Sequence, residues 1–274
     1  MALHDVMTSI NELDEKTVQM FIDRLEFRGK DPTFIQYREA YLDKLDLSHA
    51  SYVLDIGCGT GVVARALVQR PDFSGRVLGV DQSPVFIEAA QRLAAQEGVT
   101  DRVAFQVEDV HALNLPAAHF DAIVAHTLMS HVAEPLLVLK EAARVVRPGG
   151  AVALFDGDYA SWTFACTDHA LGTALEAGLI AIVGHNPRVM RDMPHLLRQA
   201  GLAVTDVMAY VYADVGKGGF FAGPAEGYAP LAARAGLVSP AQVETWLAEQ
   251  RRRREDRTFF AACNYYTYIA KRTL

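Results

Sequence analysis

Three glycines at alternate positions, Gly57, Gly59 and Gly61, form a turn able to hold a ligand against bare backbone. They follow an apolar run at 52–56 that favours a β-strand, and a helical pattern begins at Val62. Without a Cβ, the backbone adopts positive φ freely and approaches a ligand closely. Such a turn lies at the carboxyl end of a parallel strand, where open α/β sheets bind nucleotides, so it predicts a nucleotide-like ligand.

Two carboxylates specify that ligand further. Asp81 comes directly after a second apolar run at 76–80, so it faces the same crevice, where a carboxylate can accept both hydrogen bonds from a ribose diol. Asp55 lies two residues before Gly57, where a carboxylate repels phosphate and favours an ammonium group. The spacing is GxGxG, with Val62 in the place of the third glycine of the dinucleotide pattern GxGxxG. The pattern therefore favours S-adenosylmethionine over a dinucleotide.

Alternating strand and helix signals place these residues in a parallel sheet covered by helices. Strands are expected at 52–56, 76–80, 103–107, 120–125, 151–155, 203–211 and 258–270, and helices at 18–25, 34–45, 62–70, 84–97, 134–146, 169–183 and 193–199, with one more starting at Ser239-Pro240. The predicted fold class is α/β: a Rossmann-like, mostly parallel seven-stranded sheet with helices on both faces, plus N-terminal helices and a helical cap inserted before the last strand. The expected units are an N-terminal helical cap at 1–50 and a core at 51–274 with lid elements at about 157–195 and 216–257.

Composition excludes several classes of protein. With 274 residues, 51% of them hydrophobic, the chain can bury a large core, which excludes a disordered chain. A net charge of −7 gives no broad positive field for nucleic acid. Three scattered cysteines favour neither a disulfide framework nor a metal site, and the N-terminus lacks the features of a signal peptide. We expect a cytoplasmic protein without a metal, a membrane span or a nucleic-acid partner; a homodimer is left open.

Several ordered segments resemble the class I S-adenosylmethionine-dependent methyltransferases. The glycine turn in Val53-Leu54-Asp55-Ile56-Gly57-Cys58-Gly59-Thr60-Gly61 is similar to their first motif, and Gly79-Val80-Asp81-Gln82-Ser83 to their second. Val107-Glu108-Asp109-Val110 resembles the loop that borders adenine, and Phe120-Asp121-Ala122-Ile123-Val124 the fourth strand. Leu128-Met129-Ser130-His131-Val132 and Arg144-Val145-Val146-Arg147-Pro148-Gly149-Gly150 resemble the ubiquinone/menaquinone-biosynthesis-type small-molecule methyltransferases in particular. The resemblance covers about residues 34–155.

The resemblance implies S-adenosylmethionine as cofactor, S-adenosylhomocysteine as product, and a role for each matching residue. Asp81, with Gln82 beside it, would hold the ribose, and Asp109 would accept from the adenine amino group beside the amide of Val110. Asp55 would lie near the methionyl ammonium, and Arg38 would bind the methionyl carboxylate unless it is a surface arginine. The remaining cofactor residues are Gly57, Gly59, Gly61 and His126.

Catalytic and substrate residues are expected at the ends of the fourth and fifth strands. His126 and His131 follow the fourth strand and are the catalytic candidates, although a structural or cofactor-side role stays open for both. The candidates for substrate binding are Asp156, Tyr159, His185 and Arg188. The aromatic residues Trp162, Phe164, Phe220, Phe221 and Tyr228 either cover a hydrophobic substrate or form the core of the lid.

The sequence therefore predicts methyl transfer to a small, partly apolar metabolite by in-line displacement, achieved mainly through proximity and exclusion of water. The tetrapeptide Asp/Asn-Pro-Pro-aromatic, which holds an exocyclic base amine, does not follow the fourth strand, so methylation of nucleic acid is disfavoured. Two alternatives remain: an NAD(P)-dependent oxidoreductase, and an S-adenosylmethionine-binding protein without methyl transfer. The acceptor atom and the need for a general base stay open.

Overall fold

The computed structural model describes residues 14–45 and 47–273, so the first part of the N-terminal cap expected at 1–50 lies outside the described residues. Seven strands form one sheet in the order β3-β2-β1-β4-β5-β7-β6. Six of these strands run in the same direction, and β7 runs in the opposite direction between β5 and β6. The strands are β1 (Tyr52–Ile56), β2 (Arg76–Asp81), β3 (Val103–Val107), β4 (Phe120–His126), β5 (Val146–Phe164), β6 (Leu202–Gly216) and β7 (Phe259–Arg272). This is the mostly parallel α/β sheet that the sequence predicts.

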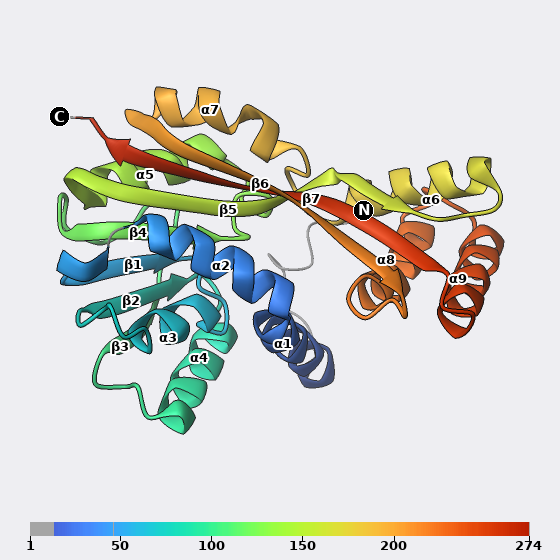
Figure 1. Cartoon of the computed structure of the whole chain (residues 1–274), viewed down its shortest axis with the longest axis horizontal. Helices are drawn as coiled ribbons and strands as arrows, with labels where there is room; N and C mark the ends of the chain where they lie inside the picture. Colours follow the sequence, from blue (N-terminus) through green and yellow to red (C-terminus); the bar gives the residue numbers. More distant parts are fainter. Residues whose placement is uncertain (1–13, 46, 274) are drawn as a thin grey trace.

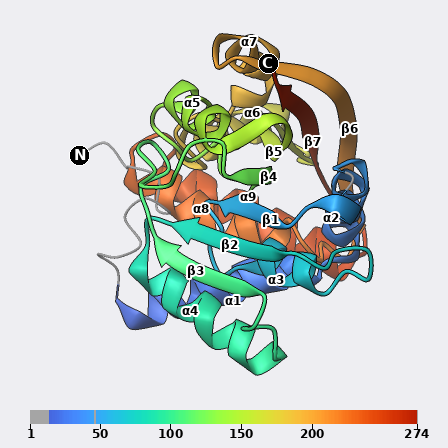
Figure 2. The same ribbon diagram turned by 90° about the vertical axis from the view of Figure 1, so that its left-hand side faces the viewer.

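Helices cover both faces of the sheet (Figure 2). They are α1 (Glu15–Lys30), α2 (Pro32–Lys44), α3 (Val62–Val68), α4 (Pro84–Glu97), α5 (Pro135–Val145), α6 (His169–Ile182), α7 (Val189–Gln199), α8 (Ala222–Arg234) and α9 (Pro240–Glu255), with a short 3-10 turn η2 (Leu47–His49). Adjacent strand residues alternate between two cores. Val53 packs in the core under α2, α3 and α4, whereas Leu54 packs in the core under α5 and α7. Among the described residues, no helix is both long and apolar enough to cross a membrane.

The long strands β5, β6 and β7 extend beyond this core into a second lobe (Figure 1). β5 was expected to end at residue 155, but it continues to Phe164 because its second half pairs with β7, from Asp156 opposite Tyr266 to Phe164 opposite Ala261. Residues 157–164, expected within a lid, are therefore a strand. Helices α6, α8 and α9 pack together at the far end of the extended strands (Figure 1).

Helix α8 was not expected, because glycines and prolines fill its sequence. Pro224 lies in its first turn, where the missing N–H has no intrahelical acceptor in any case. Pro230 does lie inside the helix, but Ala225 and Ala229 are buried on the side that meets α6 and α9. Tertiary packing therefore outweighs the low helix propensity of this segment.

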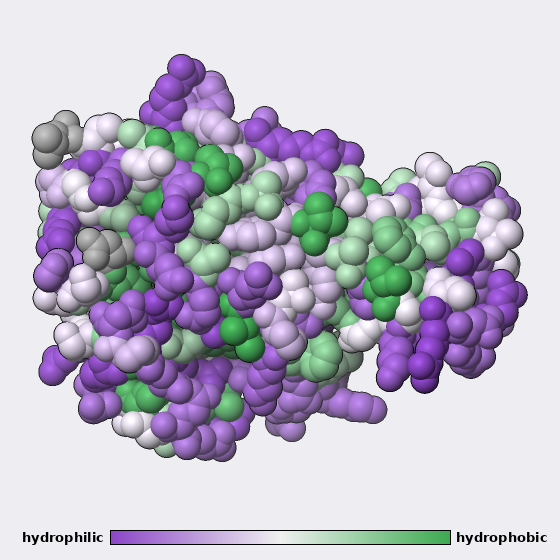
Figure 3. Space-filling view, in the orientation of Figure 1, coloured by the Kyte–Doolittle hydropathy of each residue, from purple (hydrophilic) through white to green (hydrophobic). Residues whose placement is uncertain are grey.

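Aromatic side chains form the core of the second lobe. Trp246, Phe221 and Phe259 are fully buried, and the ring of Phe164 lies 5.1 Å from that of Trp246. Trp162, Phe164, Phe221 and Tyr228 are buried in this core, whereas Phe220 is half-buried and packs against it, so these rings are core residues of the second lobe. Hydrophilic residues cover most of the face seen in Figure 3, with apolar residues scattered over the strands that join the two lobes.

Candidate functional site

The glycine turn after β1 has the backbone that its sequence predicts. Gly57, Gly59 and Gly61 have φ angles of +66°, +52° and +78°. A Cβ on Gly57 would lie 2.4 Å from the side chain of Leu128, and a Cβ on Gly59 would lie 3.3 Å from that of Leu25. Both glycines line a cavity at the carboxyl ends of the parallel strands. Gly61 differs from expectation: it is absent from the lining, and a Cβ there would lie 2.6 Å from the ring of Phe105.

The cavity has a volume of about 340 Å³ and a mainly apolar wall. Helix α1, the glycine turn, the ends of β2 and β4 and the loop after α6 surround it. The structure brings together there most of the residues that the sequence singles out, namely Arg38, Asp55, Gly57, Gly59, Asp81, Gln82, Val110, His126, His131 and His185.

Asp81 stabilises the glycine turn through a hydrogen bond and also faces the cavity. Its Oδ2 accepts a hydrogen bond from the backbone N–H of Gly59 at 2.9 Å, and its Oδ1 accepts one from that of Ser83 at 2.9 Å. Burial raises the pKa of this carboxyl, and the two N–H donors act against that shift. Each oxygen keeps a second lone pair, so both remain able to accept hydrogen bonds from a ribose diol.

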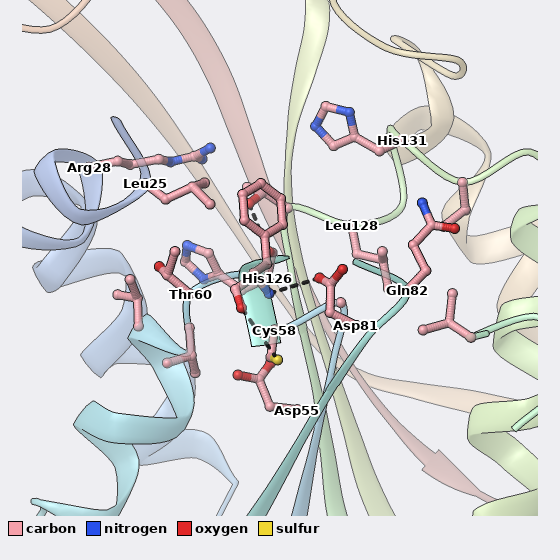
Figure 4. Close-up of a pocket in the computed structure, with 18 of the residues that line it drawn as sticks. Leu25, Arg28, Asp55, Cys58, Thr60, Asp81, Gln82, His126, Leu128 and His131 are labelled. Carbon is pink, nitrogen blue, oxygen red and sulfur yellow. Dashed lines mark hydrogen bonds between the residues drawn. The ribbon is translucent and has the colours of Figure 1, made fainter. Parts of the chain in front are cut away.

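Asp55 lies at the opposite end of the site from Arg28 and His131 (Figure 4). Its side chain is 1% exposed, and its Oδ2 accepts a hydrogen bond from the backbone N–H of Ala64 at 3.2 Å. Burial raises its pKa to about 8, and the nearby charge of Asp81 acts in the same direction. At neutral pH this carboxyl is therefore mostly protonated, and a cationic ligand would favour its ionised form.

His126 is held in place by its neighbours. Its Nδ1 lies 3.0 Å from the hydroxyl of Tyr41, and its ring stacks on Phe155 with the centroids 4.5 Å apart. Burial lowers its pKa well below the ordinary value, and the positive charges of Arg28 and Arg38 lower it further. The imidazole that faces the cavity is therefore neutral.

Several expected site residues have other contacts and do not line the cavity. Asp156 is fully buried, and its Oδ2 accepts a hydrogen bond from the N–H of Ser130 at 2.9 Å. Tyr159 is buried within the protein, and Arg188 is the residue before α7. Asp109 is exposed and lies 2.8 Å from Nδ1 of His111; that neighbour holds its pKa below the usual range. Of the four substrate candidates, only His185 lines the cavity.

The expected lid is also arranged differently. No residue of 216–257 lines the cavity, and His185 is its only lining residue from 157–195. Helix α1 covers the glycine turn instead: Glu26 accepts a hydrogen bond from the hydroxyl of Thr60 at 2.6 Å and pairs with Arg65 at 2.7 Å. This helix contributes the lining residues Leu25 and Arg28, which sequence reasoning missed. The helix was expected to end at residue 25, whereas α1 continues to Lys30 and so brings Arg28 to the cavity.

A family model described as a methyltransferase domain matches residues 53–150, the stretch that carries the glycine turn, Asp81, Val110 and His126. Over these residues the chain is similar to a methyltransferase domain. This match confirms the resemblance noted in the sequence, and S-adenosylmethionine is bound in solved structures that share the fold.

Named methyltransferases are similar to parts of the chain in sequence, and a solved structure shares its fold. The chain is 38% identical over 157 residues to methyltransferase GfsG of Streptomyces halstedii, covering 53% of this chain and 55% of that protein. It is 32% identical over 113 residues to the ubiquinone biosynthesis O-methyltransferase of Coxiella burnetii, covering 41% and 46%. The crystal structure of a candidate methyltransferase of Bacillus halodurans matches 86% of this chain and 99% of its own, with a TM-score of 0.62 at 15% identity. The chain spans about half the length of the curated relatives it matches.

Proposed function

We propose that this protein transfers a methyl group from S-adenosylmethionine to a small, partly apolar metabolite. One observation carries the proposal: Gly57, Gly59 and Asp81 lie in the same cavity as His126 and a mainly apolar wall. One side of the cavity has the bare backbone and carboxylate that an adenosine requires, and the rest of its wall is mainly apolar, as an apolar acceptor would need. The relative named for ubiquinone biosynthesis supports a small acceptor of this kind.

The residues of the turn suit a ligand with a ribose and an ammonium group. We assign the ribose to Asp81, with Gln82 beside it, and the adenine to the segment around Val110, where His111 also lines the cavity. Asp55 would receive the ammonium, because a positive neighbour stabilises its ionised form. Gly57 and Gly59 would lie against the ligand, because side chains there would fill the space beside Leu128 and Leu25.

Arg38 is the candidate for the cofactor carboxylate. It lines the cavity from α2, and its side chain is only 12% exposed, so it is not a free surface arginine. Its Nε donates a hydrogen bond to Oε1 of Glu39 at 3.0 Å and its Nη2 lies 3.0 Å from the same oxygen, which leaves the remaining N–H groups of the guanidinium for a ligand.

The cofactor, when bound, supplies a methyl group already activated by its positive sulfur. The protein then has to align an acceptor and exclude water, which lowers a barrier by up to about 7–11 kcal/mol. Helix α1, held by Glu26, closes one side of the cavity for this purpose. His126 and His131 line the acceptor side and are our candidates for contact with the reacting group.

Incubation of the purified chain with a labelled methyl donor and fractionated metabolite extracts tests the proposal. We expect one small compound to gain label together with formation of S-adenosylhomocysteine, and no transfer by an Asp81→Ala variant. Binding of the donor without transfer to any fraction would favour a binding protein instead. Binding of NAD(H), seen as a spectral change on titration, would favour an oxidoreductase.

A further inference from the structure

Arg28 is a half-buried arginine in the cavity wall whose guanidinium is only partly satisfied by the described residues. It lines the cavity from the last turn of α1, and its Nε and Nη2 atoms are buried without a hydrogen-bond partner in the described part of the chain. No ion pair joins it to a carboxylate of residues 14–45 or 47–273. Its guanidinium carbon instead lies 4.3 Å from the ring centroid of Phe34 and 5.8 Å from that of Tyr265.

A guanidinium in this environment is energetically unfavourable unless a ligand supplies acceptors for its N–H groups and a negative charge. A guanidinium stays charged at any physiological pH, and a buried charge without a partner is strongly destabilising. Asp156 acts on Arg28 only from beyond ion-pair distance, and its own oxygens accept hydrogen bonds from the N–H groups of Ser130 and Gly157. Tyr159 and Asp156 favour the charged form of Arg28, and an anionic ligand in the cavity would supply the ion-pair partner that residues 14–45 and 47–273 do not.

His126 provides a second donor in the same region. The hydroxyl of Tyr41 is fully buried, and Nδ1 of His126 is its one hydrogen-bond partner within the described ranges; we assign the hydroxyl as the donor, because its hydrogen has no other acceptor there. The neutral ring then carries its hydrogen on Nε2 and acts as a donor toward a ligand. Arg28 and His126 together offer N–H groups, which suit an anionic oxygen.

The position of Arg28 separates it from the cofactor side of the site. Figure 4 shows Arg28 and His131 at one end of the cavity, with Asp81 between that end and Asp55. The groups whose charges act on Arg28 are Tyr159, Tyr265 and Asp156, none of which belongs to the glycine turn or to β2. The other arginine, Arg38, acts on Tyr41 together with Asp55 and is the one assigned to the cofactor carboxylate.

We propose that the methyl acceptor carries an anionic oxygen group, a carboxylate or a phenolate, which Arg28 binds at the end of the cavity away from Asp55. The inference rests on the proposed function and deepens it by naming the acceptor class. The rings of Phe34 and Tyr265 beside the guanidinium give the rest of such an acceptor an apolar surface.

Calorimetry on the full chain saturated with S-adenosylhomocysteine tests this proposal with two pairs of probes. The pairs are naphthoate with naphthamide, and para-nitrophenolate with para-nitroanisole, so that each anion has a neutral counterpart of similar shape. We expect at least one anion to bind about tenfold to a hundredfold more tightly than its neutral counterpart. The pair that shows the larger preference identifies the group as carboxylate or phenolate. Equal binding within both pairs, or no binding of either anion, would overturn the proposal.

Two variants assign the preference to Arg28. Arg28→Met should remove the preference for the anion, and Arg28→Lys should retain part of it, because lysine keeps the charge but loses the planar fork. Circular dichroism checks that both variants fold, and the lysine variant keeps the test valid if the methionine variant does not. A preference that survives in both folded variants would contradict the assignment.

The cofactor is the other source of a carboxylate, and a further comparison separates the two. Methylthioadenosine shares the adenosine of S-adenosylhomocysteine but lacks its amino-acid group. If Arg28→Met weakens S-adenosylhomocysteine about tenfold or more and leaves methylthioadenosine unchanged, Arg28 binds the cofactor and the proposal is wrong. Failure of the wild-type chain to bind S-adenosylhomocysteine would instead count against the proposed function itself.

Discussion

Acidification should weaken the binding of S-adenosylhomocysteine through the carboxyl of Asp55. Burial raises the pKa of Asp55 to about 8. The ionised fraction is then roughly one in a hundred at about pH 6 and about a quarter at about pH 7.5. If the ionised carboxylate contacts the ligand ammonium, affinity should rise about twentyfold over that interval.

Calorimetry in buffers of different ionisation enthalpy measures both the affinity and the proton release. Near pH 7 about nine-tenths of a proton should leave Asp55 for each ligand bound. Asp55→Asn should flatten the pH profile and abolish this release. Methylthioadenosine, which lacks the ammonium, should bind the wild-type chain with little pH dependence. An equal affinity for S-adenosylhomocysteine at both pH values would refute the contact.

The same carboxyl should make the stability of the ligand-free protein fall as pH rises, whereas the affinity for S-adenosylhomocysteine rises with pH. Between about pH 4 and about pH 8, the folded chain holds a proton on Asp55 that the unfolded chain has released. Stability should therefore fall as pH rises through this window, by at most about 1.4 kcal/mol per pH unit. Urea unfolding of the wild type and of Asp55→Asn measures the difference in slope.

Three further changes have outcomes that the structure specifies. Asp81→Ala should weaken the binding of S-adenosylhomocysteine by about 3–6 kcal/mol, because it removes two hydrogen bonds to a charged group. Asp72→Ala, on the exposed surface, is the control and should leave binding unchanged in the same titration. Gly57→Val should abolish binding, since even a Cβ there meets Leu128 at 2.4 Å and the φ angle is +66°, and methylthioadenosine binding is the direct readout. Trp246→Ala should destabilise the fold by about 3–5 kcal/mol in urea unfolding, because it empties the core of the second lobe, while S-adenosylhomocysteine should still bind the folded fraction.

Local signals in the sequence were sufficient for the parallel half of the fold. β1 and β3 have the predicted bounds, and β2 and β4 extend one residue further. Ser83 and Ser239 each cap a helix that begins at the following proline. Apolar runs, glycine turns and caps depend on residues close together in the chain, and this explains their success.

The remaining features depend on contacts between distant segments. β5 extends to Phe164 because β7, a hundred residues later, pairs with it, and α8 forms despite Pro224 and Pro230 because α6 and α9 bury one of its sides. The residues near β5 and α8 in the sequence give no indication of these distant partners.

The candidate site was predictable on the cofactor side and much less so on the acceptor side. Asp81 and the turn at Gly57 and Gly59 follow known motifs. Arg28 follows none, since only the packing of α1 over the turn brings it to the cavity. Asp156 was misplaced for a related reason: the continuation of β5 buries its carboxyl beneath the loop that holds Ser130.

The strand order has a consequence for synthesis of the chain. β7 lies between β5 and β6 and provides the ladder partners of both, yet it is the last of the seven strands to leave the ribosome. Until residues 259–272 emerge, the outer half of β5 and the whole of β6 have no partner in the sheet, and each presents unpaired backbone to neighbouring nascent chains. Pairing of this half of the sheet therefore has to wait until β7 has been synthesised, whereas β1, β2, β3 and β4 can pair before it.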